Sequence, residues 1–330
     1  VVTGTVYGLA SIPDAQATEQ SASAAAPTDT LLATFPDRRK EQFQTSFGYA
    51  LFPYPYQIPG IGKGLGLVGG AMNIGGSYTD AYGIVFTGDV QGFAGGVADI
   101  HLIPRTLILD VGYSRVNKAT LQSYSVRGME SSKDDYRLLE IEDSENYGGR
   151  LTATFLERRM EVYGGWYQRA SQLGSIRDKD GTLIVEAQGA ERSTDHTLIL
   201  GTRFDRTDDY NDPRRGVRVD ISRFQTPPTN SGPDFSVYDF NFTGYVPIGS
   251  RSTWVFNHLR SDAVVSRQGE TDSAAIQQQN GINCANPSLT PQQQQFCNEV
   301  VNNIIANNTY GTATSLGGLS RLRSYSQARF

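Results

Sequence analysis

The sequence predicts an all-β fold, namely a transmembrane antiparallel β-barrel of the outer-membrane type. Three observations support this prediction. Apolar and polar side chains alternate along many segments of about ten residues, long enough to cross a bilayer as tilted strands. In these segments one face is apolar and the other is charged or polar, which suits lipid outside and a polar lumen inside. No run approaches the roughly eighteen apolar residues of a transmembrane helix.

The clearest example is a hairpin between residues 197 and 224. In its second arm Val217, Val219 and Ile221 alternate with Arg218 and Asp220, so the aliphatic and charged side chains point to opposite faces of a strand. The polar faces of this hairpin and of the next alternating segment are expected to line the lumen. Their members are Arg203, Arg218, Asp220, Asp239 and Asn241.

A turn joins the two arms of this hairpin. It is rich in acidic residues, proline and glycine, all of which favour turns. The residues that define it are Asp205, Asp208, Asp209, Pro213 and Gly216.

The chain is expected to begin with non-barrel segments. Residues 1–17 resemble the remnant of a secretory signal peptide, because Ala15, Gln16 and Ala17 form a small-x-small cleavage pattern. Residues 18–42, rich in Ala, Ser, Thr and Pro before they become charged, are predicted to be a disordered leader. Residues 43–330 are predicted to form the barrel.

About eleven strands are predicted. They lie near 43–52, 64–74, 82–91, 94–103, 106–116, 148–156, 160–169, 196–206, 216–226, 235–247 and 252–265. From residue 104 onward short connections alternate with mostly long ones, as outer-membrane barrels separate periplasmic turns from external loops. The connections at 117–147, 170–195, 227–234 and 266–321 are mostly long and are therefore expected to face outside. The first of them contains the acidic stretch 140–145.

Residues 266–322 are predicted to be a long lid loop that contains a helix. Thr290 and Pro291 suit the N-cap and first position of a helix, and Phe296, Val300 and Ile304 then recur at four-residue spacing. The same connection contains the only two cysteines, Cys284 and Cys297. They suggest a disulfide formed in an oxidising compartment, with two unpaired thiols as the alternative.

The end of the sequence resembles a known family. Gly317 and Gly318, followed by Arg323, Ser324 and Tyr325, resemble the lid-loop motif of the bacterial surface antigen family, the outer-membrane assembly-factor barrels of the BamA and TamA type. The acidic hairpin turn also resembles a recurrent turn of that family. The resemblance implies that the C-terminal strands are missing and that the chain is a fragment of a barrel without POTRA (polypeptide-transport-associated) domains.

The resemblance also implies how the lid works. The loop would fold into the lumen, where Arg323 would pair with acidic groups and Tyr325 would pack beside it. Ser324 stands where the family has glycine, so the loop of this chain would differ there. If that position needs a positive φ, serine is costly.

The implied function is to help proteins or lipids into or across the bacterial outer membrane, without enzymatic activity. The implied partners are outer-membrane lipid and either client membrane proteins or a separate periplasmic partner. The alternative is a channel without POTRA domains, or a surface antigen whose external loops bind a ligand. An open lumen would favour the channel, and a lid locked at Arg323 would favour the assembly-type barrel.

Other classes of function find little support. A net charge of -5 and the absence of a basic patch with interleaved aromatic residues argue against nucleic-acid binding. The three histidines are not arranged with a serine nucleophile, and no spacing typical of metal ligands is present. The sequence therefore predicts no catalytic residues, no metal and no cofactor.

Overall fold

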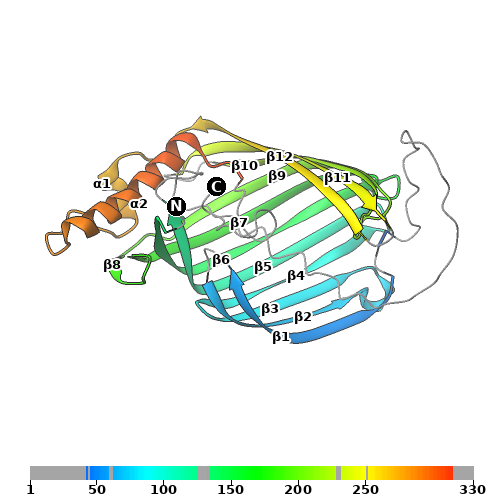
Figure 1. The fold of residues 1–330 in the computed structure, drawn as a ribbon, viewed down its shortest axis with the longest axis horizontal. Helices are drawn as coiled ribbons and strands as arrows, with labels where there is room; N and C mark the ends of the chain where they lie inside the picture. The colour runs from blue at the N-terminus through cyan, green and yellow to red at the C-terminus, as the bar shows by residue number, and fades with distance from the viewer. Residues whose placement is uncertain are drawn as a thin grey trace.

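The protein forms one large antiparallel sheet that curves into an open half-barrel (Figure 1). The computed structural model describes residues 42–43, 45–58, 62–124, 132, 134–227, 232–249 and 252–314. Eleven long strands follow one another in sequence order across the sheet, from β1 at one edge to β12 at the other, and the short β8 pairs only with β7. The predicted all-β fold is confirmed.

The strands are β1 (Gly48–Ile58), β2 (Gly62–Met72), β3 (Asp80–Gly88), β4 (Val90–Ile103), β5 (Leu107–Tyr124), β6 (Tyr136–Phe155), β7 (Met160–Arg177), β8 (Leu183–Glu186), β9 (Ser193–Thr207), β10 (Gly216–Thr226), β11 (Asp234–Ile248) and β12 (Ser252–Arg267). The helices are a single 3-10 turn η1 (Ile74–Gly76), α1 (Ser273–Gln279) and α2 (Pro291–Tyr310). Neither α-helix in the described part of the chain has the length and apolarity needed to span a membrane.

Each of the eleven predicted strands has a counterpart, but the predicted start of the first strand was wrong. Phe43 does not open a strand, and β1 instead runs from Gly48 to Ile58. Pro53 and Pro55 lie inside β1, where a central strand would lose hydrogen bonds. They are tolerated because β1 is an edge strand that pairs only with β2.

The long external loop predicted at 117–147 is largely wrong as well. β5 and β6 continue as a paired ribbon as far as Tyr124 and Tyr136. The register of β6 against β7 shifts between Glu142 and Glu145, and Asp143 between them has a positive φ of 45°. The irregularity interrupts the alternation that would reveal the strands in the sequence. The acidic stretch 140–145 is therefore part of β6, where Glu140 pairs with Lys118 at 2.7 Å.

The two faces of the sheet differ in chemistry. Large apolar side chains are exposed on one face, for example Leu200 (62%), Phe204 (45%), Ile221 (51%) and Trp254 (61%). We call this the outer face, because such exposure suits contact with lipid. The opposite face, called the inner wall below, carries the arginines and carboxylates of the same strands.

The two ends of the sheet also differ. The connections β2–β3, β4–β5, β6–β7, β9–β10 and β11–β12 meet at one end, called the turn end. At the opposite end, called the cap end, β8, α1 and α2 form a compact cap (Figure 1). Its core combines strand and helix side chains that are almost fully buried. They include Leu139, Ile176, Ile184, Ile276, Val301 and Ile304.

The cap confirms two sequence predictions. Thr290 and Gln293 form a capping box at the start of α2, and Pro291 occupies the first turn. Cys284 and Cys297 form a buried disulfide with their Cα atoms 5.3 Å apart. Arg137 of β6 fixes α2 to the sheet, because it stacks on Phe296 at 3.6 Å and pairs with Glu299 at 3.1 Å.

Candidate functional site on the inner wall

The acidic turn between β9 and β10 is held by its own side chains. Asp208 accepts hydrogen bonds from the backbone N–H groups of Arg214 (2.9 Å) and Arg215 (3.0 Å). Asp209 accepts in the same way from Asn211 and Asp212, at 3.0 and 2.9 Å. These carboxylates therefore satisfy backbone donors that a tight turn leaves unpaired.

Gly216 ends the turn in a conformation that suits only glycine. Its φ is 112°, and a Cβ there would lie 2.1 Å from the carbonyl oxygen of Arg206. Pro213 lies in the middle of the turn, before β10 begins. The residues that the sequence singled out for this turn thus lie together at the turn end.

Asp205 is the most deeply buried residue of the turn motif, with no exposed surface. It accepts from the backbone N–H of Thr207 at 2.9 Å and from its hydroxyl at 2.6 Å. Arg218 of β10 pairs with the other carboxylate oxygen at 2.7 Å. Because Arg218 and Asp205 are opposite one another in register, the hairpin itself creates this pair.

A second ion pair lies one step further along the hairpin. Arg203 and Asp220 are cross-strand partners, and the guanidinium donates to the carboxylate. Arg203 also donates to the Tyr210 hydroxyl at 2.7 Å and lies 3.6 Å from Glu161 of β7. Glu161 is only 3% exposed and accepts from Tyr210 as well, at 3.2 Å. Buried charges of this kind are tolerated because each has a partner.

Arg158, in the turn between β6 and β7, connects this network to Phe43, which precedes β1. Its guanidinium lies 4.0 Å from the centre of the Tyr210 ring and 4.7 Å from that of Phe43. It pairs with Glu161 at 3.0 Å. Burial by itself disfavours its charge, but Tyr210 and Glu161 outweigh burial, and the pKa of Arg158 is raised above its ordinary value. The contacts of the Arg158 guanidinium with the two rings therefore join three separate segments at the turn end.

Sequence reasoning did not single out Phe43, Arg158, Glu161 or Tyr210 as a group. Glu161 had a detectable signal, since it stands at a lumen-facing position of the alternating segment 160–169. Arg158 and Phe43 had none, because their contact joins residues more than one hundred positions apart.

The two predicted lumen residues of β11 lie on the same inner wall, separate from the arginine network. Asn241 accepts from the side-chain amide of Asn257 at 2.7 Å. Asp239 accepts from the hydroxyl of Thr314, at 3.0 and 2.8 Å for its two oxygens. The Thr314 N–H donates to Ser261 of β12 at 2.9 Å. The chain that leaves α2 therefore returns to the inner wall.

The lid motif itself, comprising Gly317, Gly318, Arg323, Ser324 and Tyr325, lies outside the described residues. Among the described residues, no group of His, Cys, Asp and Glu is arranged to hold a metal ion.

A long antiparallel sheet with an apolar outer face and a charged inner wall defines the class of membrane β-barrels. The comparison with protein families identifies the particular group. Residues 77–298 match the Omp85 superfamily domain, so the chain belongs to the Omp85 superfamily and lies in the bacterial outer membrane. The sequence-based resemblance to barrels of the BamA and TamA type is confirmed at the level of the family.

The search of curated protein sequences gave no match. Among solved structures, the chain is similar to BamA from Haemophilus ducreyi lacking POTRA domains 1-3, with 15% identity and a TM-score of 0.40. The alignment covers 70% of this chain and 42% of that one, so the chain spans less than half of the BamA chain that it matches.

Proposed function

We propose that this protein is a non-enzymatic barrel that helps proteins or lipids to enter or cross the bacterial outer membrane, with its lumen occupied by its own lid loop. Membership of the Omp85 superfamily supports the general class. Client membrane proteins, or a separate periplasmic protein that delivers them, are the partners that this function requires.

The return of the chain to the inner wall after α2 is the observation that carries the proposal. Gly311 lies against the side chains of Phe235 and Val265, and Thr314 is bonded to Asp239 and Ser261. The lid motif begins only three positions later, at Gly317. The chain thus lies on the inner wall at Thr314, which supports the lid position that the family resemblance implies.

The ion pairs of the inner wall limit which carboxylate could pair with Arg323. Asp205, Asp220 and Glu161 already pair with Arg218, Arg203 and Arg158. Among the described residues Asp239 is bonded to the Thr314 hydroxyl and to no cation, and Thr314 comes three positions before the lid motif. We therefore propose Asp239 as the carboxylate nearest to the docked lid motif.

Single-channel conductance of the full-length protein in planar bilayers tests whether the lid fills the lumen. We expect a small, unsteady conductance that increases in Arg323→Ala, because the arginine holds the loop in place. Arg260→Ala is the control, since the Arg260 side chain is 71% exposed and, among the described residues, forms its ion pair with Asp262 on the outer face. A large, steady conductance that is unaffected by Arg323→Ala would contradict the proposal and indicate a porin-like channel.

The assembly function needs a separate readout. An unfolded outer-membrane β-barrel protein should insert faster into vesicles that contain this protein than into empty vesicles. Equal insertion rates would contradict the assembly function even if the lumen proves to be plugged.

A further inference from the structure

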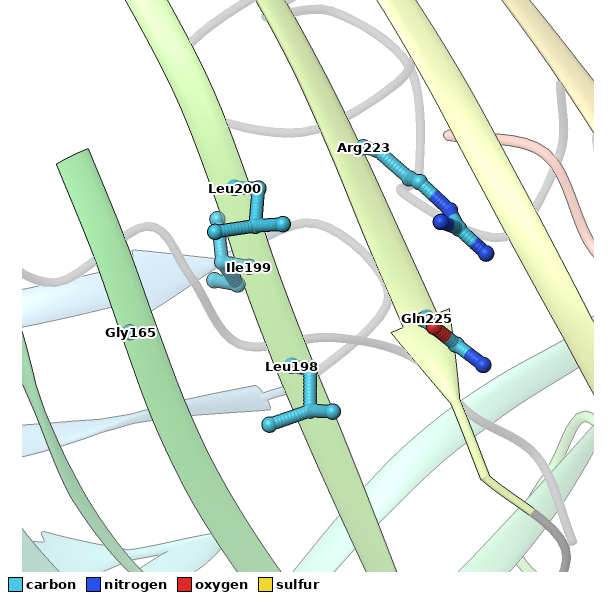
Figure 2. A pocket seen from close by; sticks show the side chains of 6 residues that line it. All are labelled: Gly165, Leu198, Ile199, Leu200, Arg223 and Gln225. Atoms are coloured by element: carbon cyan, nitrogen blue, oxygen red, sulfur yellow. The ribbon is translucent and has the colours of Figure 1, made fainter. Parts of the chain in front are cut away.

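The outer face of β9 and β10 carries a groove that is apolar except for two side chains. It has a volume of about 170 Å³ (Figure 2). The residues that line it are Gly165, Leu198, Ile199, Leu200, Arg223 and Gln225. Leu200 and Arg223 are cross-strand partners, as are Leu198 and Gln225, so two apolar side chains lie directly beside two polar ones. Such a combination fits an amphipathic ligand.

Arg223 differs from the arginines of the inner wall. Its Nε and Nη2 atoms donate to the Ser236 hydroxyl at 3.1 and 2.9 Å, and its guanidinium lies 5.8 Å from the centre of the Tyr238 ring. Neither partner is charged. Within the part of the chain that the structure describes, no carboxylate forms an ion pair with Arg223. Among these residues its charge is thus unneutralised, on the face that we assign to contact with lipid.

The position of the groove along the strands indicates what covers it. Trp166 of β7 is the cross-strand partner of Leu198 and stacks on His196, with ring centres 5.7 Å apart. Aromatic side chains of this kind gather where the hydrocarbon meets the headgroups. Arg223 and Gln225 lie near the cap end of β10, at the height of this aromatic pair. The groove therefore spans the boundary between acyl chains and headgroups.

We propose that this groove binds an anionic membrane lipid, whose phosphate pairs with Arg223 and whose acyl chain lies along Leu198 and Leu200. A guanidinium forms strong charge-assisted hydrogen bonds with phosphate. The preference for an anionic over a neutral headgroup should be about fivefold, because a basic residue near a charged membrane surface contributes about 1 kcal/mol. This inference rests on the outer-membrane location and not on the proposed assembly function.

The two tryptophans make the proposal testable. Trp166 adjoins the groove, whereas Trp254 lies near the turn end of β12, also on the outer face. In Trp254→Phe, Trp166 is the only tryptophan of the chain. The full-length protein is placed in bilayers that contain phosphatidylcholine, with a minor fraction of phosphatidylglycerol whose acyl chains are brominated. Quenching of Trp166 then reports how often phosphatidylglycerol occupies the adjacent site.

We expect phosphatidylglycerol to be enriched about fivefold at Trp166 and to lose this enrichment in Arg223→Gln. Arg223→Lys should retain most of it. Arg115→Gln is the matched control, because Arg115 is another arginine of the outer face but already pairs with Asp143 at 3.1 Å. It should leave the enrichment unchanged.

Two results would overturn the proposal. One is an enrichment that survives Arg223→Gln. The other is an equal enrichment at Trp254, measured in Trp166→Phe, which would show a general effect of charge. Salt provides a test that needs no change at Arg223: at about 1 M salt, where the Debye length is only about 3 Å, the enrichment at Trp166 should fall markedly.

Discussion

Two regions of the inner wall fill the same concave surface in different ways. In β3–β7 one row across the sheet consists of Tyr82, Gly96, Gly112, Gly148 and Tyr167, each opposite the next in register. We call this region the glycine-tyrosine wall. It continues into β1 and β2, where the Tyr54 and Tyr56 rings lie over Gly66 and Gly64.

In β7–β11 the corresponding row is Glu161, Arg203, Asp220 and Asn241, again in register. We call this region the arginine-carboxylate wall. Except for the neutral Asn241, the side chains of this row are charged, and they are held by ion pairs and by the Tyr210 hydroxyl.

The difference shows which physical term stabilises each region. At most glycines of the glycine-tyrosine wall a tyrosine side chain occupies space that a Cβ would need, so stability depends on the absence of a side chain there. A Cβ at Gly148, for example, would lie 2.6 Å from the Tyr167 ring and 2.3 Å from the carbonyl oxygen of Trp166. In the arginine-carboxylate wall, stability depends on each buried charge keeping its partner.

The largest effect is expected from removing a buried carboxylate of the arginine-carboxylate wall. Asp205→Ala removes the carboxylate that pairs with Arg218 and accepts from Thr207, and it should lower the free energy of unfolding by about 3–5 kcal/mol. Urea-induced unfolding of the protein in lipid vesicles measures this quantity. Asp262→Ala, which breaks an exposed ion pair with Arg260, should cost no more than about 1 kcal/mol. Equal costs for the two variants would contradict the distinction between buried and exposed pairs.

A smaller effect is expected from adding a methyl group to the glycine-tyrosine wall. A Cβ at Gly66 would meet the Tyr54 ring at 2.6 Å, and no backbone atom is among its nearest neighbours. Gly66→Ala should therefore cost about 1–3 kcal/mol, measured by the same unfolding experiment.

The Tyr54→Ala background provides the control for this prediction. Without the ring, the same change at Gly66 should cost less than half as much, since the clash is gone. An unchanged cost would mean that backbone conformation, rather than the ring, requires glycine at this position.

The smallest effect is expected from removing a single tyrosine hydroxyl, and two tyrosines can be compared. Tyr210→Phe keeps the ring that stacks on Arg158 but loses the hydrogen bonds with Arg203 and Glu161, and should cost about 1.5 kcal/mol. Tyr54→Phe should be nearly neutral, because the Tyr54 hydroxyl has no hydrogen-bond partner among the described residues and only its ring fills space. A larger cost for Tyr54→Phe than for Tyr210→Phe would reverse the proposed roles of the two regions.

The fold could be predicted because alternation with a period of two is a local property. The segment at β10 was predicted with the same bounds that the structure gives, since Val217, Val219 and Ile221 alternate without interruption and Gly216 marks the start. Prediction failed at β5 and β6, where a bulge near Asp143 breaks the period, and at β1, whose prolines are compatible only with an edge strand.

The candidate site was only partly predictable. Arg203, Arg218 and Asp220 could be assigned to one face because the hairpin that contains them is local. Their further partners could not, since Glu161 and Phe43 come from distant parts of the chain.

The sequence by itself determined most of the strands, their polar and apolar faces, the acidic turn and the capped helix, and it suggested the disulfide. All of these depend on neighbours within a few positions, or on two cysteines within one connection. Only the tertiary structure decided that Arg158 joins Phe43 to Tyr210 and that the chain after α2 returns to Asp239. It also decided that Arg223 has no charged partner among the described residues of the outer face. These contacts depend on the curvature of the sheet, which brings distant strands and turns together, and no local pattern of residues records that curvature.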